Sequence, residues 1–224
     1  MRMQVARVCD ADDCRTFAGK FHSSPQARLY RDRFRSGRRA RIDRLERAAL
    51  RRLLIGLRVE SALDIPCGAG RLAPVLMEVA ARVIEADASA AMLDLARQEL
   101  AAAPVTYLET DARHIDLADA SVDLVFCHRL LHHIHATDAR RQILAEFVRI
   151  ARRYVLVSYY TPGFRDRARW LWSALRGAGA DRPASYRGFL REAAAVGLAL
   201  AGSAVLRRFP LQARFCLFER EKRP

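Results

Sequence analysis

Apolar residues recur every three or four positions in the segment before residue 58, and this spacing predicts an amphipathic helix. The apolar series is Ile42, Leu45, Ala49, Leu53 and Leu57. Arginines fill most of the other positions, and Gly56 is expected to end the helix because glycine is common just past a helix end. A helix with one apolar face needs a surface to pack on, so this segment is expected to lie against the rest of the chain.

Short apolar runs alternate with longer helical patterns between residues 61 and 160. The predicted strands are 61–65, 82–87, 104–109, 121–127 and 154–160, and the predicted helices are 71–81, 88–103 and 138–153. Strands that alternate with helices are typical of a parallel sheet with helices on both faces.

The end of the chain departs from this alternation. Residues 161–183 form a basic insert with two tryptophans, and a helix is expected around 184–196. Two further strands, 199–209 and 212–220, are joined by a short connection near Pro210 and are expected to pair antiparallel. The predicted fold class is therefore α/β, a Rossmann-like doubly wound sheet of about seven strands, mostly parallel, with an antiparallel C-terminal strand.

Composition and charge limit the class of protein. A chain of 224 residues with 51% hydrophobic residues fits one domain with a substantial core. The net charge is +14, and residues 28–58 alone contain twelve arginines against three acidic residues. This excess favours an anionic partner, yet a solvated helix face and a phosphate-binding surface both remain open as interpretations.

No stretch of the sequence approaches the 18 apolar residues typical of a membrane span, and the first residues are charged. A cytoplasmic protein is therefore expected. The five cysteines include no C-x-x-C pair, so they are interpreted as reduced thiols rather than disulfides or zinc ligands.

The most informative segment is SALDIPCGAGRL, residues 61–72, where Asp64 ends a predicted strand just before Gly68 and Gly70. Glycines allow close approach of a ligand and expose backbone N–H groups at the start of the next helix. A carboxylate there would repel a pyrophosphate and attract a ligand that carries an ammonium and a sulfonium. The segment GAGRLA also fits the glycine fingerprint of a nicotinamide site, which is the alternative for these residues.

These residues resemble the first motif of the class I S-adenosylmethionine-dependent methyltransferases: acid, apolar, Gly, x, Gly, x, Gly. Pro66 stands at the first glycine, which stiffens the turn and removes one backbone donor. Three further segments match in order: RVIEADASAAML, YLETDARHIDL and DASVDLVFCHRLLHHI. The last is similar to small-molecule methyltransferases related to quinone and lipid methylation. The resemblance covers about residues 48–160 and implies S-adenosylmethionine as cofactor.

The resemblance also implies roles for individual residues. Asp87 would accept hydrogen bonds from both ribose hydroxyls, and Asp111 would accept one from the adenine amino group. Met92 would pack near the adenine, and the backbone at Ala112 would contact the edge of the ring. The cofactor-binding residues expected on this basis are Asp64, Pro66, Cys67, Gly68, Gly70, Asp87, Ala88, Met92, Asp111, Ala112 and His128.

Four of the six histidines fall within residues 128–135. His128 and His132 are the candidates for a general base, with a pKa near neutrality, because the end of the fourth strand faces the methyl donor in this family. His133 is expected to pack or cap. A metal site on a helix face shared by His128 and His132 is an alternative, but no complete ligand pattern supports it. Strand alternation sends Tyr159 and Tyr160 to opposite faces, so one at most lines the site, and Tyr160 is the catalytic candidate.

Two regions are expected. Residues 1–57 would form a basic helical region that covers the cofactor, and residues 58–224 the methyltransferase domain, with a substrate lid near 161–183 that could also contact a membrane surface. The expected function is methyl transfer to a small-molecule or lipid-like acceptor, anionic acceptors included. An RNA methyltransferase and a non-catalytic binding protein are the alternatives. DNA amino-methyltransferases are disfavoured because their asparagine-proline-proline-aromatic motif does not follow the fourth strand.

Overall fold

The computed structural model describes residues 24–134, 136–161, 163, 168, 171–172, 175–176, 185–207 and 213–221. Most of the predicted lid near 161–183 and the connection at Pro210 lie outside these residues. Among the described helices, none combines the length and apolar character needed to cross a membrane. The three described cysteines, Cys67, Cys127 and Cys216, are buried free thiols, as expected.

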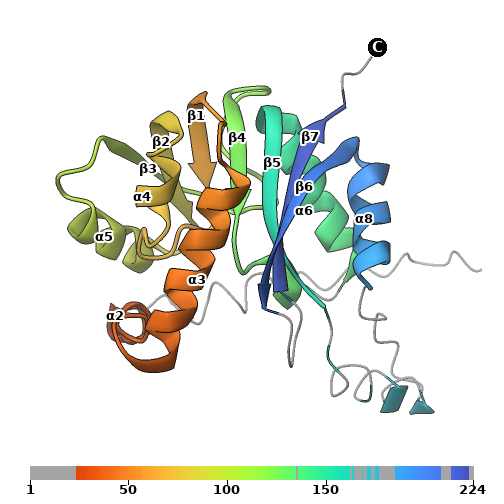
Figure 1. Ribbon diagram of the computed structural model, residues 1–224, viewed down its shortest axis with the longest axis horizontal. Helices are drawn as coiled ribbons and strands as arrows, with labels where there is room; N and C mark the ends of the chain where they lie inside the picture. Colours follow the sequence, from red (N-terminus) through yellow and green to blue (C-terminus); the bar gives the residue numbers. More distant parts are fainter. Residues whose placement is uncertain are drawn as a thin grey trace, which may run out of the picture.

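One seven-stranded sheet forms the centre of the molecule (Figure 1). Its strands are β1 Val59–Asp64, β2 Ala80–Asp87, β3 Val105–Glu109, β4 Val122–Cys127, β5 Ala151–Tyr160, β6 Leu198–Arg207 and β7 Ala213–Arg220. Their order is β3-β2-β1-β4-β5-β7-β6, and β7 runs antiparallel to both of its neighbours while the other pairs are parallel. The predicted fold class is confirmed.

Helices cover both faces of the sheet. They are α2 Ser24–Asp32, α3 Gly37–Leu53, α4 Ala73–Leu76, α5 Ala90–Glu99, α6 Thr137–Ile150 and α8 Tyr186–Ala195, with a 3-10 turn η1 at Leu131–His133. Leu50 of α3 packs with Phe126 and Phe215 on one face, whereas Phe147 and Phe189 of α6 and α8 belong to the core on the other. In Figure 1, α2 and the start of α3 lie beyond the carboxyl end of β1.

Three predicted elements differ in detail from the structure. The helix expected over 71–81 is a short one, Ala73–Leu76, and the helix expected over 138–153 ends at Ile150. In both cases the following residues pair in the sheet: β2 starts at Ala80 opposite Val59, and β5 starts at Ala151 opposite Val122. Strand pairing therefore outweighs the helix propensity of alanine and arginine at these ends.

The third difference concerns the buried face of α3. Leu45 belongs to the predicted apolar series but is 52% exposed, while Glu46 is 3% exposed. The buried residues of α3 are Glu46, Ala49 and Leu50. The helix is thus rotated so that a carboxylate, rather than a leucine, points inward near the carboxyl ends of the strands. Glu46 points inward because it forms ion pairs there with Arg71 and Arg129.

Candidate active site

A cavity of about 400 Å³ lies at the carboxyl ends of β1, β2 and β4, within the usual size range of small-molecule sites. The sequence-predicted cofactor residues all line it: Asp64, Pro66, Cys67, Gly68, Gly70, Asp87, Ala88, Met92, Asp111, Ala112 and His128. They come from four separate segments, which the parallel strands bring to one edge of the sheet.

The glycine turn after β1 has the geometry that its sequence predicts. Gly68 and Gly70 have φ values of +58° and +71°, a region open to glycine and costly for other residues. A Cβ on Gly70 would lie 2.5 Å from Leu100 Cδ1. Asp87 holds the turn in place, because its carboxylate accepts hydrogen bonds from the N–H groups of Gly68 and Ser89, each at 2.9 Å.

Three carboxyl groups, those of Asp64, Glu85 and Asp87, lie close together at the edge of the sheet beneath this turn. Asp64 is 2% exposed, and burial, followed by Glu85, raises its pKa well above the ordinary value. Glu85 pairs with Asp64 in the β1–β2 register. Glu85 is fully buried and has no ion pair among the described residues, and burial raises its pKa to about 8, although the nearby Cys67 thiol lowers it. The sequence analysis did not single out Glu85.

These carboxyl groups provide a test of whether the expected cofactor fits. No side-chain cation lies within ion-pair distance of Asp64 or Glu85 among the described residues. Uncompensated buried carboxyl groups favour a cationic ligand, since a nearby positive charge offsets their desolvation. Of the two residues, only Asp64 lines the cavity. An ammonium and a sulfonium supply the positive charge, so the Asp64 carboxyl group fits S-adenosylmethionine and disfavours the pyrophosphate of a nicotinamide dinucleotide.

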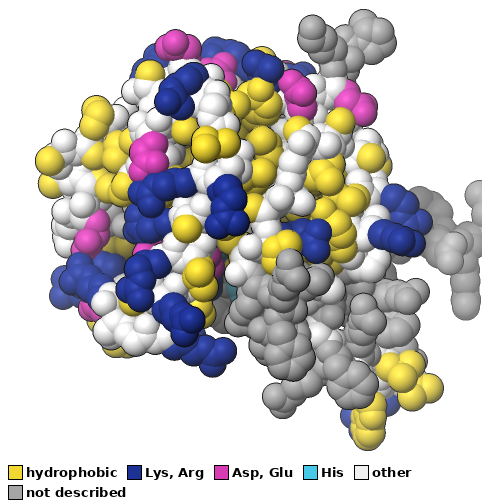
Figure 2. All heavy atoms as spheres, viewed as in Figure 1, with side chains coloured by type: hydrophobic (Ala, Val, Ile, Leu, Met, Phe, Trp, Pro, Cys, Tyr) yellow, Lys and Arg dark blue, Asp and Glu magenta, His cyan; other side chains and the backbone are white. Residues whose placement is uncertain are grey.

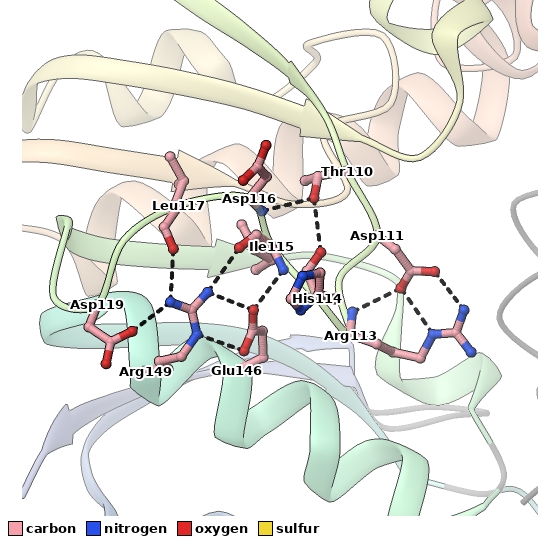
Figure 3. Close-up of polar contacts among 10 residues, drawn as sticks. All are labelled: Thr110, Asp111, Arg113, His114, Ile115, Asp116, Leu117, Asp119, Glu146 and Arg149. Atoms are coloured by element: carbon pink, nitrogen blue, oxygen red, sulfur yellow. Dashed lines mark hydrogen bonds and ion pairs between the residues drawn. The ribbon is translucent and has the colours of Figure 1, made fainter.

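The loop of residues 110–121 joins β3 to β4 without a helix, and side chains of α6 hold it by hydrogen bonds to its backbone (Figure 3). Arg149 donates to the carbonyl oxygens of Ile115 and Leu117 at 2.9 and 2.8 Å, and Glu146 accepts from the Ile115 N–H at 2.6 Å. These contacts place Asp111 on the cavity wall, where its carboxylate pairs with Arg113 at 2.6 Å. Sequence reasoning missed Glu146 and Arg149 because nothing in a helical pattern shows which loop a side chain holds.

Glu46 of α3 connects the N-terminal helices to the cavity. Its carboxylate contacts Arg71, from the segment after the glycine turn, at 2.9 Å and Arg129, after β4, at 2.6 Å. Arg71 also pairs with Asp43 of the same helix. Arg129 has a φ of +62°, and the Ser158 hydroxyl accepts its backbone N–H at 2.8 Å. A strained backbone of this kind persists where the surroundings hold it.

His128 is 7% exposed and packs against the rings of Phe126 and Phe215. Burial lowers its pKa to about 4, although Glu46 lies 3.3 Å from its Nε2. Burial thus lowers the pKa of His128 below the near-neutral value expected of a general base. Arg129 Nε donates to His128 Nε2 at 3.1 Å, which assigns the proton of the neutral ring to Nδ1. In this state His128 is a weak base, and its Nδ1–H is a hydrogen-bond donor.

The other catalytic candidates lie beside the cavity rather than on its wall. His132 is in the η1 turn, its ring centroid 4.3 Å from that of Tyr160. His128 precedes that turn, so the two histidines do not share a helix face, and the described residues contain no cluster suited to a metal ion. Tyr160 follows Tyr154 and Leu156 on the α3 face of β5, while Tyr159 stacks on Phe189 across the sheet. Burial raises the pKa of Tyr160 to about 12.

Comparison with known proteins finds similarity to methyltransferases. A family model described as a methyltransferase domain matches residues 63–156. An uncharacterized methyltransferase of Mycobacterium tuberculosis is 30% identical over 118 residues, which are 53% of this chain and 60% of that protein. A malonyl-[acyl-carrier protein] O-methyltransferase of Yersinia pestis is 34% identical over 117 residues, 51% of this chain and 42% of that protein. The chain thus spans at most about 60% of the length of these relatives.

Solved structures share the fold over nearly the whole chain. Magnesium protoporphyrin IX methyltransferase from Synechocystis with bound S-adenosylhomocysteine has a TM-score of 0.72 at 19% identity, covering 94% of this chain and 100% of that one. The N-methyltransferase NodS from Bradyrhizobium japonicum, in complex with the same compound, has a TM-score of 0.66 at 15% identity, covering 94% and 100%. Residues 63–156 thus match a methyltransferase domain, and the chain shares its fold with solved methyltransferases that bind S-adenosylmethionine or its product.

Proposed function

We propose that this chain transfers a methyl group from S-adenosylmethionine to a small-molecule or lipid-like acceptor that carries an anionic group. The observation that carries the proposal is the convergence of all the sequence-predicted cofactor residues on one cavity, together with the buried carboxyl group of Asp64 on its wall, which has no ion-pair partner among the described residues. A dinucleotide site would leave this carboxyl group unexplained.

The cofactor would be held by three acidic residues on successive strand ends. Asp64 would face its ammonium group, Asp87 its ribose hydroxyls and Asp111 its adenine amino group. Gly68 and Gly70 would admit it close to the backbone. When bound, the cofactor supplies a methyl group on a sulfonium, which is a good leaving group.

The work left to the protein is alignment and exclusion of water, which can lower a barrier by about 7 to 11 kcal/mol. Tyr30 and Phe34, from α2 and the turn after it, line the cavity and would cover it together with α3. An acceptor whose attacking atom is itself an anionic oxygen has no proton to lose and needs no general base. This agrees with the lowered pKa of His128, whose Nδ1–H would orient the acceptor rather than remove a proton from it.

Two comparisons support an anionic acceptor without deciding which one. One relative is named for malonyl-[acyl-carrier protein], whose malonyl group carries a carboxylate, and one structural neighbour for magnesium protoporphyrin IX. The net charge of +14 would draw such acceptors toward the protein.

The proposal is tested by donor binding and by turnover. Calorimetry should show binding of S-adenosylmethionine, and incubation of the protein with methyl-labelled donor and a fractionated lysate should label small anionic compounds. Asp87→Asn should weaken donor binding about 10-fold or more, since it weakens charge-assisted hydrogen bonds. A protein that binds NAD but not S-adenosylmethionine would refute the proposal. Donor binding without labelling of any fraction would indicate the non-catalytic alternative.

An RNA acceptor is a second candidate because of one feature of α3. Figure 2 shows basic side chains gathered over α2 and α3, at its lower left. Among the described residues, four exposed arginines in the first half of α3 have no carboxylate partner: Arg38, Arg39, Arg41 and Arg44. RNA bound by such a surface would dissociate steeply with rising salt. Failure to bind RNA at low salt would exclude this candidate.

A further inference from the structure

Several buried polar atoms near the cavity have no hydrogen-bond partner among the described residues. They are Arg33 Nε, His128 Nδ1, Tyr160 Oη and Thr161 Oγ1. All four can donate a hydrogen bond, and His128 and Tyr160 lie on the same face of the sheet, the face that α3 covers. Buried donors without acceptors are uncommon in folded proteins, so this group indicates a ligand that brings acceptor oxygens.

Guanidinium groups surround the same place. Arg33, Arg71 and Arg129 lie 5.1, 4.5 and 5.2 Å from the centroid of the Phe34 ring. Arg71 and Arg129 share Glu46, and Arg71 also pairs with Asp43. Arg33 has no carboxylate within ion-pair distance among the described residues, and it stacks on Tyr30 at 3.8 Å. The cluster therefore has more positive than negative charge.

Tyr160 and Arg129 connect the two observations. Arg129 donates to His128 at 3.1 Å and lies within electrostatic range of Tyr160 and of Arg33. His128 thus contacts Arg129, Arg33 and Arg129 lie near the same Phe34 ring, and Tyr160 lies within electrostatic range of Arg129 at the end of β5. His128, Arg71 and Arg129 line the cavity, whereas Arg33 and Tyr160 lie beside it.

We infer that Arg33, Arg129, His128 and Tyr160 form an anion subsite that binds a carboxylate or phosphate group of the methyl acceptor. This inference rests on the proposed function and adds to it the chemical class of the acceptor. Arg33 supplies the uncompensated charge and an open donor, Tyr160 and His128 supply further donors, and Glu46 keeps Arg129 in place. Arginine suits this task because its planar fork matches the geometry of both anions.

The subsite is tested with small anions on protein saturated with S-adenosylhomocysteine, at constant ionic strength. The probes are succinate and inorganic phosphate, with succinamide as the uncharged control for succinate. Binding is followed by calorimetry for wild type, Arg33→Gln and Tyr160→Phe. Arg52→Gln is the matched control, because Arg52 is exposed on the last turn of α3. Its replacement removes the same unit of charge as Arg33→Gln. Thermal unfolding verifies that each variant is folded.

We expect wild type to bind one of the two anions and to ignore succinamide, and the anion that binds identifies carboxylate or phosphate as the group recognised. Arg33→Gln should weaken that binding about 10- to 100-fold and Tyr160→Phe several-fold, while Arg52→Gln stays within about twofold. The inference is overturned if wild type binds neither anion, or if Arg33→Gln and Arg52→Gln weaken binding equally. A wild-type protein that does not bind S-adenosylhomocysteine would instead refute the proposed function, and anion binding can be measured without it.

Discussion

Glu85 offers the sharpest test of the electrostatics beneath the glycine turn. Its carboxyl group is fully buried without an ion pair among the described residues, and burial raises its pKa to about 8 from an ordinary value of 4.5, although the nearby Cys67 thiol lowers it. As the pH rises through 4.5 the unfolded chain loses this proton, while the folded chain keeps it until about pH 8. The unfolded state is therefore favoured increasingly over this range, and stability falls as pH rises. Glu85→Gln, which cannot ionise, should lack this loss.

The magnitude follows from the two pKa values. Each pH unit between them lowers the free energy of unfolding by up to about 1.4 kcal/mol per proton. Between about pH 5.5 and about pH 7.5 the wild type should lose about 2.5 kcal/mol from this group, because the folded carboxyl begins to ionise near the upper limit. For a chain of this size that is a fall of about 5 to 10 °C in Tm.

The assay is urea unfolding of the ligand-free protein at several pH values across that range. The difference in slope between wild type and Glu85→Gln reports the Asp64–Glu85 pair, because Glu85 also raises the pKa of Asp64. Glu60→Gln is the control, because Glu60 is exposed on β1 and its replacement should leave the slope unchanged. Parallel curves for wild type and Glu85→Gln would show that Glu85 is ionised in the fold and that the reasoning is wrong.

Three further predictions concern the cavity. Asp64→Asn should weaken binding of S-adenosylmethionine about 10- to 100-fold, measured by calorimetry, and unchanged affinity would exclude an ion pair with the ligand. Gly70→Ala should lower the free energy of unfolding by about 2 to 4 kcal/mol, because the added Cβ would clash with Leu100. Gly37→Ala has open space around its Cβ and should lower it by only about 1 to 2 kcal/mol. Equal losses for the two variants in urea unfolding would contradict the predicted clash. Glu46→Gln leaves two arginines less well compensated and should cost about 2 to 3 kcal/mol at pH 7, and a loss no larger than that of Glu60→Gln would mean that Glu46 does not hold the helix.

The elements and the residues that line the cavity were predictable because their signals are local. The alternation of apolar runs follows from strands buried on both faces, and the glycines after β1 are needed wherever φ is positive. Asp64, Asp87 and Asp111 could be assigned to one site because the carboxyl ends of parallel strands meet at one edge. None of this requires knowledge of long-range packing.

The arginines around Glu46 and the buried carboxyl pair depend on packing between distant segments. Nothing near Glu46 in the chain shows that Arg71 and Arg129 will meet it, so the apolar series placed Leu45 inward instead. Glu85 reads as an ordinary strand residue until its register with Asp64 is known. The pKa of His128, too, depends on desolvation by rings from β4 and β7. Burial and charge pairing are properties of the assembled fold, and local patterns carry little information about them.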